Sequence, residues 1–141
     1  MNYPDSIKQK VEFFFSSLDL SNTFFLPERT EDGIFELQQE KDGKRLKVSG
    51  CYPILFCNSS RHALLLNEQD ALGFFKFEKI DIKKIRFKNF KVDYESSSLK
   101  ITTDYFSITF FPTEQWGWGI QYDNELHLLE ALEYGGIEIR I

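Results

Sequence analysis

The chain has 141 residues, of which 42% are hydrophobic and 16% aromatic, and it contains 15 Phe but only 4 Pro and 8 Gly. This composition excludes an intrinsically disordered protein, because the chain has enough apolar side chains to form a core. A chain of this length is typical of one domain, so we expect residues 1–141 to fold as a single α+β unit.

The formal net charge of −5 is unevenly distributed. Between Lys76 and Lys91, seven basic residues stand beside two acidic ones, which gives +5 locally and leaves −10 on the rest of the chain. Charged residues stand where a signal peptide has its apolar segment, and no window of about 18 successive residues is apolar. We therefore expect a soluble, cytoplasmic protein.

Residues 4–20 have the apolar periodicity of a helix. The apolar side chains recur every three or four positions and form one stripe, which consists of Ile7, Val11, Phe14, Phe15 and Leu18. Pro4 at the first helical position or Asp5 as the N-cap can begin this helix. The stripe predicts that the helix packs on a sheet.

A β-hairpin is predicted next, because residues 33–40 and 44–50 read as strands on either side of Lys41-Asp42-Gly43. Asp-Gly is a preferred pair for a type I′ turn, in which both residues have positive φ. The residues expected to face the core are Phe35, Leu37, Leu46 and Val48.

Two short strands are predicted at residues 53–57 and 62–67, separated by a turn. Residues 68–73 are predicted to form another turn, and residues 74–78 the following strand. The alternation of apolar and polar residues over 74–111 indicates a run of antiparallel strands.

That alternation slips by one position at Lys83-Lys84 and again at Lys88-Asn89. A slip of one residue turns every following side chain to the opposite face of the sheet. Each of these points must therefore be a bulge or a turn.

Residues 113–119, in which two Trp alternate with Gly, are predicted to form an irregular loop. A second helix is predicted over residues 123–134, followed by a strand at 137–141. The buried line of this helix would consist of Leu126, Leu129 and Leu132. The predicted fold is α+β, with a bent antiparallel sheet of about seven to nine strands packed by an N-terminal and a C-terminal helix.

Few residues suit catalysis or metal binding. Cys57 and His62 could form a nucleophilic Cys–His pair, which leaves an unrecognised enzyme as one alternative. The local sequence matches no thiol-enzyme motif, so we expect a protein that is not an enzyme. Cys51 and Cys57 are expected to stay reduced in a cytoplasmic protein. Two His and two separated Cys do not supply a metal-ligand set, and no cofactor is expected.

The basic run is the first candidate binding surface. Lys83, Lys84, Arg86 and Lys88 lie among aromatic residues and could form one basic face. Such a face could bind nucleic acid or a membrane surface, or its lysines could protect a Phe-rich strand from aggregation. Nucleic acid is disfavoured, because the −10 charge of the remaining chain would repel a polyanion.

Trp116 and Trp118 are the second candidate. Exposed Trp residues on a loop supply much contact area for a partner at a small cost in conformational entropy. The alternative is that the two indoles cap one end of the core under the predicted second helix.

The order of elements resembles that of bacterial pleckstrin-homology-like and GRAM-like domains. Residues 62–66, 79–85, 99–110 and 125–133 are similar in apolar spacing to successive elements of that family, the last being its closing helix. The chain differs in beginning with a helix, in lacking a Trp in the closing helix, and in the strand that follows it. The resemblance implies a lipid, peptide or protein ligand.

The lack of a catalytic motif, the small size and the acidic remainder of the chain favour non-enzymatic protein binding. Within that class we favour an immunity-type inhibitor of a basic toxin or nuclease, because complementary charge accelerates association. The alternative is a pleckstrin-homology-like module that binds anionic lipid or a peptide through the basic run.

Overall fold

The computed structural model describes residues 4–20, 23–27, 33–81, 85–113, 117–123, 127–131 and 136–140. Within these ranges the chain forms two helices, α1 (Asp5–Ser17) and α2 (Glu68–Phe77). Sheet 1 contains, in spatial order, β1 (Ile34–Lys41), β2 (Lys44–Cys51), β8 (Trp118–Tyr122), β9 (His127–Ala131) and β10 (Ile137–Arg140). Sheet 2 contains β4 (His62–Leu65), β3 (Ile54–Cys57), β7 (Ser107–Phe110), β6 (Ser98–Thr103) and β5 (Phe87–Asp93).

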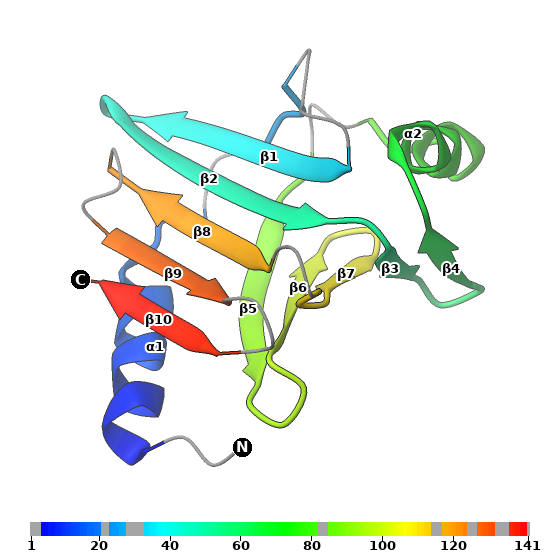
Figure 1. The fold of residues 1–141 in the computed structure, drawn as a ribbon. Helices are drawn as coiled ribbons and strands as arrows, with labels where there is room; N and C mark the ends of the chain where they lie inside the picture. The colour runs from blue at the N-terminus through cyan, green and yellow to red at the C-terminus, as the bar shows by residue number, and fades with distance from the viewer. Residues whose placement is uncertain are drawn as a thin grey trace.

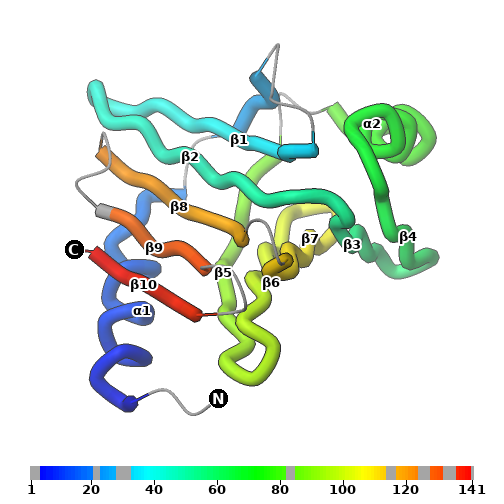
Figure 2. Tube along the Cα trace, viewed as in Figure 1, coloured from blue at the N-terminus to red at the C-terminus, as the bar shows by residue number. Residues whose placement is uncertain are grey.

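Both sheets are antiparallel, and they lie at an angle to one another (Figure 1). The predicted α+β class is confirmed, but the single bent sheet of about seven to nine strands is wrong, since the described residues form two sheets of five strands each. Only Tyr52 and Pro53 separate β2 from β3, so the chain passes directly from one sheet into the other (Figure 2). The two helices lie at opposite sides, α1 near β10 and α2 near β4.

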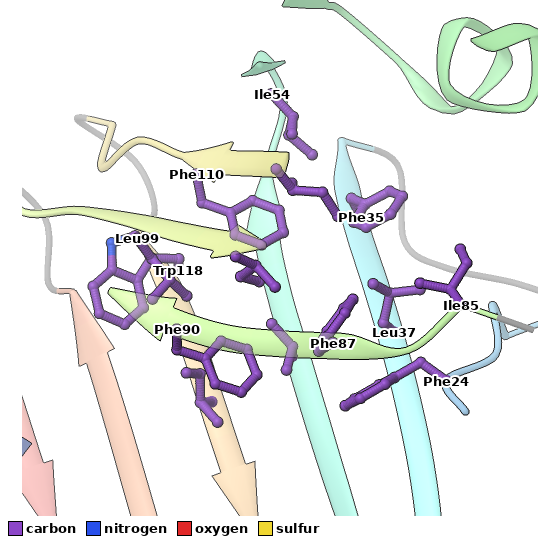
Figure 3. Packing of buried hydrophobic residues seen from close by; sticks show 14 of the residues in the cluster. Phe24, Phe35, Leu37, Ile54, Ile85, Phe87, Phe90, Leu99, Phe110 and Trp118 are labelled. Carbon is purple, nitrogen blue, oxygen red and sulfur yellow. The ribbon is translucent and has the colours of Figure 1, made fainter. Parts of the chain in front are cut away.

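The facing sides of the two sheets form one hydrophobic core (Figure 3). The ring of Phe24 stacks on that of Phe87 with centroids 4.0 Å apart, and Phe35 of β1 lies 6.0 Å from Phe110 of β7. Gly50 permits this close approach, because a Cβ atom at that position would lie 2.2 Å from the Phe110 ring. Aromatic rings from both sheets therefore pack against one another in this core.

The predicted N-terminal helix is confirmed as α1. Val11 and Phe14 are buried, and Phe15 stacks on Phe90 of β5 at 5.6 Å. Pro4 occupies the N-cap position, so neither predicted start is the observed one. The helix covers the side of the core where β5 and β10 lie (Figure 1).

The predicted hairpin is confirmed as β1 and β2. Asp42 and Gly43 connect the two strands with φ of 54° and 77°, as a type I′ turn requires. The four residues expected to face the core are all buried.

The short strands predicted from residues 53 and 62 correspond to β3 and β4, and the terminal strand to β10. The register of β5 against β6 shifts between Phe87 and Asn89, which confirms the bulge predicted at Lys88-Asn89. The slip predicted at Lys83-Lys84 lies outside the described residues.

The prediction for residues 68–78 is wrong, because these residues form α2 instead of a turn and a strand. The Asn67 side chain accepts a hydrogen bond from Asp70 N and caps the helix. Ala71, Phe74 and Phe75 then bury one helical face against the core. Gly73, which lies in the predicted turn, faces solvent on this helix.

The predicted C-terminal helix is also wrong. Its described part is the strand β9, which pairs with β8 on one side and β10 on the other. Leu128 and Leu129 are both buried although they face opposite sides of the sheet, which is typical of a central strand. Pairing on both edges therefore outweighed the helix-like spacing of the leucines. The predicted irregular loop ends sooner than expected, since β8 begins at Trp118.

Candidate functional site

Trp118, predicted as a possible contact residue, is a core residue. Its side chain is 1% exposed and lies beside Leu99 (Figure 3). Its Nε1–H donates a hydrogen bond to Ser97 O at 2.7 Å, which ties β8 of sheet 1 to the turn between β5 and β6. The core interpretation of this Trp is therefore the correct one, although it packs between the sheets and not under a helix. Trp116 lies outside the described residues.

The basic run is divided between two elements. Lys76 is on α2, whereas Arg86, Lys88 and Lys91 are on or next to β5, and all four are exposed. Lys83 and Lys84 lie outside the described residues. Lys79 is exposed just after α2, so only Arg86, Lys88 and Lys91 form a basic strip along β5, the last strand of sheet 2.

A groove of about 570 Å³ opens on the outer face of sheet 2 beside this strip. Lys91 of β5 and Lys100 of β6 are cross-strand neighbours and both line the groove. The Asp93 carboxylate, at the same end, accepts hydrogen bonds from Glu95 N and Ser96 N. Lys100 lies outside the continuous basic run and so was not predicted as a site residue. The position of Lys100 opposite Lys91 depends on the register of β6 against β5.

Cys57 and His62 are directly opposite one another in the β3–β4 pair, on the outer face of sheet 2. No hydrogen bond joins the Cys57 Sγ to the His62 imidazole. The described ranges contain no cluster of three or more His, Cys, Asp or Glu residues that could hold a metal ion. This pair therefore has the proximity of a nucleophilic dyad but not its hydrogen bond.

Sheet 1 carries a carboxylate pair on its outer face. Glu130 of β9 lies directly opposite Glu138 of β10. Burial and then repulsion from Glu138 raise the pKa of Glu130, while Arg140 lowers it. Burial also raises the pKa of the Cys51 thiol, which favours its neutral form.

Exposed apolar side chains gather where β4 leads into α2. Seven large apolar side chains of the described residues are exposed, and four of them come from this short segment. These four are Leu64 (56% exposed), Leu66 (64%), Leu72 (47%) and Phe77 (71%). We call this region, residues 61–79, the β4–α2 corner. Figure 1 shows it projecting at the side of the molecule opposite α1.

Arg61 holds the most exposed of these side chains in place. Its guanidinium lies 4.8 Å from the ring centroid of Phe77 and 5.0 Å from that of Phe74. Its Nε is 3.6 Å from Glu78 Oε1, an oxygen buried from solvent. Phe77 is thus an aromatic side chain on the surface in cation–π contact with Arg61.

Sequence reasoning missed the β4–α2 corner, because it assigned residues 74–78 to a strand. The signal that could have identified it is the cap Asn67-Glu68-Gln69-Asp70, followed by apolar residues at helical spacing. That spacing leaves Phe77 outside the buried line of α2, which consists of Ala71, Phe74 and Phe75.

In the described part of the chain, neither helix has the length and apolar character needed to cross a membrane. No protein-family model, no curated protein and no solved structure matches this chain.

Proposed function

We propose that this protein is a non-enzymatic protein-binding protein whose contact surface is the outer side of α2 in the β4–α2 corner. The observation that carries the proposal is Phe77, which is 71% exposed and yet held by Arg61. Aromatic residues, Phe included, and Arg are enriched in protein–protein interfaces.

The cation–π contact with Arg61 favours one orientation of Phe77 and so lowers the free-energy cost of binding. A side chain that is already ordered loses little rotamer freedom when a partner covers it. Leu72, on the same helix, adds exposed apolar area. Removing this apolar surface from water would stabilise the complex with the partner.

The specific form that we propose is an immunity-type inhibitor of a toxin or nuclease. The net charge of −5 supports this form, since it would attract a basic partner over a distance and accelerate association. The apolar contacts of the β4–α2 corner would then provide the short-range part of the affinity.

Two variants that remove the same side chain from different helices test the proposal. Phe77→Ala should reduce recovery of a specific partner by at least about tenfold in quantitative affinity purification, since a central aromatic contact contributes about 2 kcal/mol or more. Phe13→Ala is the matched control, because Phe13 is a 63% exposed side chain on α1. Equal recovery by both variants would contradict the proposed surface. For the inhibitor form, the purified chain should suppress the recovered partner's toxic or nuclease activity, and undiminished activity would contradict it.

A second candidate function is binding of an anionic lipid headgroup or an acidic peptide in the groove of sheet 2. The observation that favours it is the direct opposition of Lys91 and Lys100, a like-charged cross-strand pair that an anion bound between them would stabilise. Flotation with phosphatidylserine vesicles at low and high salt tests this function. Binding that salt weakens, and that Lys91→Gln with Lys100→Gln removes while Lys76→Gln keeps, would support it. No flotation at low salt would exclude the lipid.

A further inference from the structure

We propose that β4 pairs edge to edge with β4 of a second copy of this chain, in an antiparallel register that places His62 opposite Leu64 of the second copy. The pairing would join two copies of sheet 2 into one continuous sheet. It does not depend on the partner proposed above, which contacts the outer side of α2.

The hydrogen bonds of the β3–β4 turn fix the direction of the backbone groups of β4. Asn58 N donates to Arg61 O at 3.0 Å, so these two residues form a hydrogen-bonded pair at the β3–β4 turn. Hydrogen-bonded and non-hydrogen-bonded pairs alternate along an antiparallel ladder. In the β3–β4 ladder, Ala63 therefore forms a hydrogen-bonded pair with its β3 neighbour, whereas His62 and Leu64 form non-hydrogen-bonded pairs with theirs.

It follows that the N–H and C=O groups of His62 and Leu64 point away from β3, toward the open side of β4. The next residue in the same series is Leu66, whose N–H donates to Asp70 Oδ2 at 3.0 Å. Neither His62 nor Leu64 has such a partner among the described residues. β4 is also the last strand of its sheet, and the side chains of both residues are exposed.

The other sheet edges are covered or protected. At β1, Phe25 N donates to Gln38 O at 2.9 Å and Gln38 N donates to Phe25 O at 3.0 Å. At β5 there is a bulge with exposed Lys88 and Lys91, both of which are common protections against edge pairing. At β10 the charged side chains of Glu138 and Arg140 are exposed, which also opposes edge pairing. The β4 edge has neither a bulge nor a Lys, Pro or acidic residue.

A second copy is the occupant that fits this edge best. The two residues whose backbone groups face the open side, His62 and Leu64, lie on either side of Ala63. A twofold axis at Ala63 therefore places His62 of each copy opposite Leu64 of the other copy. Each of these pairs forms two reciprocal backbone hydrogen bonds.

The charge of the surrounding region also favours a second copy. With His62 neutral, the charged residues of the β4–α2 corner are Arg61, Lys76 and Lys79 against Glu68, Asp70 and Glu78, so their charges sum to zero. Two copies can therefore approach there without the repulsion that the net charge of −5 produces elsewhere.

The expected dimer is weak. Stable interfaces bury about 800 Å² on each partner, and a four-residue strand edge with Leu64 and Leu66 supplies less than that. We therefore expect a monomer–dimer equilibrium that shifts with concentration and that depends on the backbone N–H of Leu64.

Analytical ultracentrifugation over a concentration series, from micromolar to near-millimolar protein, tests the proposal. The wild-type chain should shift from monomer to dimer as its concentration rises. Leu64→Pro removes an N–H that β3 does not use, and it should give a monomer at every concentration. Leu64→Ala keeps the N–H and should weaken association only a few-fold, while Phe13→Ala should leave it unchanged. A wild-type chain that stays monomeric, or a dimer that persists in Leu64→Pro, would overturn the proposal.

Hydrogen exchange of the wild-type chain gives an answer that does not depend on folding of the Pro variant. The amides of His62 and Leu64 should exchange quickly in dilute solution and more slowly in concentrated solution. The amides of Ala63 and Leu65, which are bonded to β3, should stay protected in both. Concentration-independent exchange at His62 and Leu64 would refute the pairing.

Discussion

β5 and β4 are the two outermost strands of sheet 2, and their edges differ in almost every respect. β5 is seven residues long, contains a bulge, and places Lys88 and Lys91 on its outer side. β4 is four residues long, has no charged Lys, Asp or Glu, and exposes Leu64. The difference indicates that the long, Phe-rich edge is the one protected against unwanted pairing, whereas the short edge is left open.

The largest expected effect is on the free energy of unfolding, because the two edge strands bury their side chains in the core to different extents. Phe87 of β5 is 3% exposed and stacks on Phe24, so Phe87→Ala should lower the free energy of unfolding by about 3–5 kcal/mol. Leu64→Ala on β4 should change it by about 0.5 kcal/mol or less, because that side chain is already in solvent. Urea unfolding of both variants measures the two values. Similar losses would remove the contrast between the two edges.

An intermediate effect concerns Arg61, next to β4. Arg61→Gln removes the cation beside the buried Glu78 Oε1 and the contact with Phe77, so it should destabilise the fold by about 1–2 kcal/mol. Arg45→Gln is the matched control, because its ion pair with Glu40 is solvent-exposed, and it should cost about 0.5 kcal/mol or less. Thermal unfolding compares them. Equal shifts of Tm would show that Arg61 is an ordinary surface residue.

The smallest effect on stability is expected from replacing the lysines that protect the β5 edge. The same change should have a separate effect on self-association. Replacing Lys88 and Lys91 together by Leu should change the unfolding free energy by about 0.5 kcal/mol or less, since both side chains are exposed. The same double variant should increase light scattering in concentrated solution, because it leaves Asp93 as the single charged side chain of an apolar edge strand. Lys76→Leu on α2 should scatter like the wild type. Unchanged scattering of the double variant would mean that the bulge alone protects this edge.

The candidate surface was less predictable than the fold. The basic run and the Trp pair were identified from their composition, yet Trp118 is buried and the described cations of the run are divided between α2 and β5. Phe77 and Lys100 were missed. The exposure of Phe77 depends on the helical direction of α2, and the position of Lys100 depends on the register of β6 against β5.

Elements with strong local signals followed from the sequence alone. The α1 stripe, the turn at Asp42-Gly43 and the β5 bulge each depend on residues close together in the chain, and the helical or alternating pattern there agrees with the observed structure. Only the tertiary structure decided the state of residues 127–131, because pairing with two neighbouring strands stabilises β9 more than its leucine spacing favours a helix. It also decided that the apolar residues form two sheets around one core, since the facing strands come from distant parts of the chain.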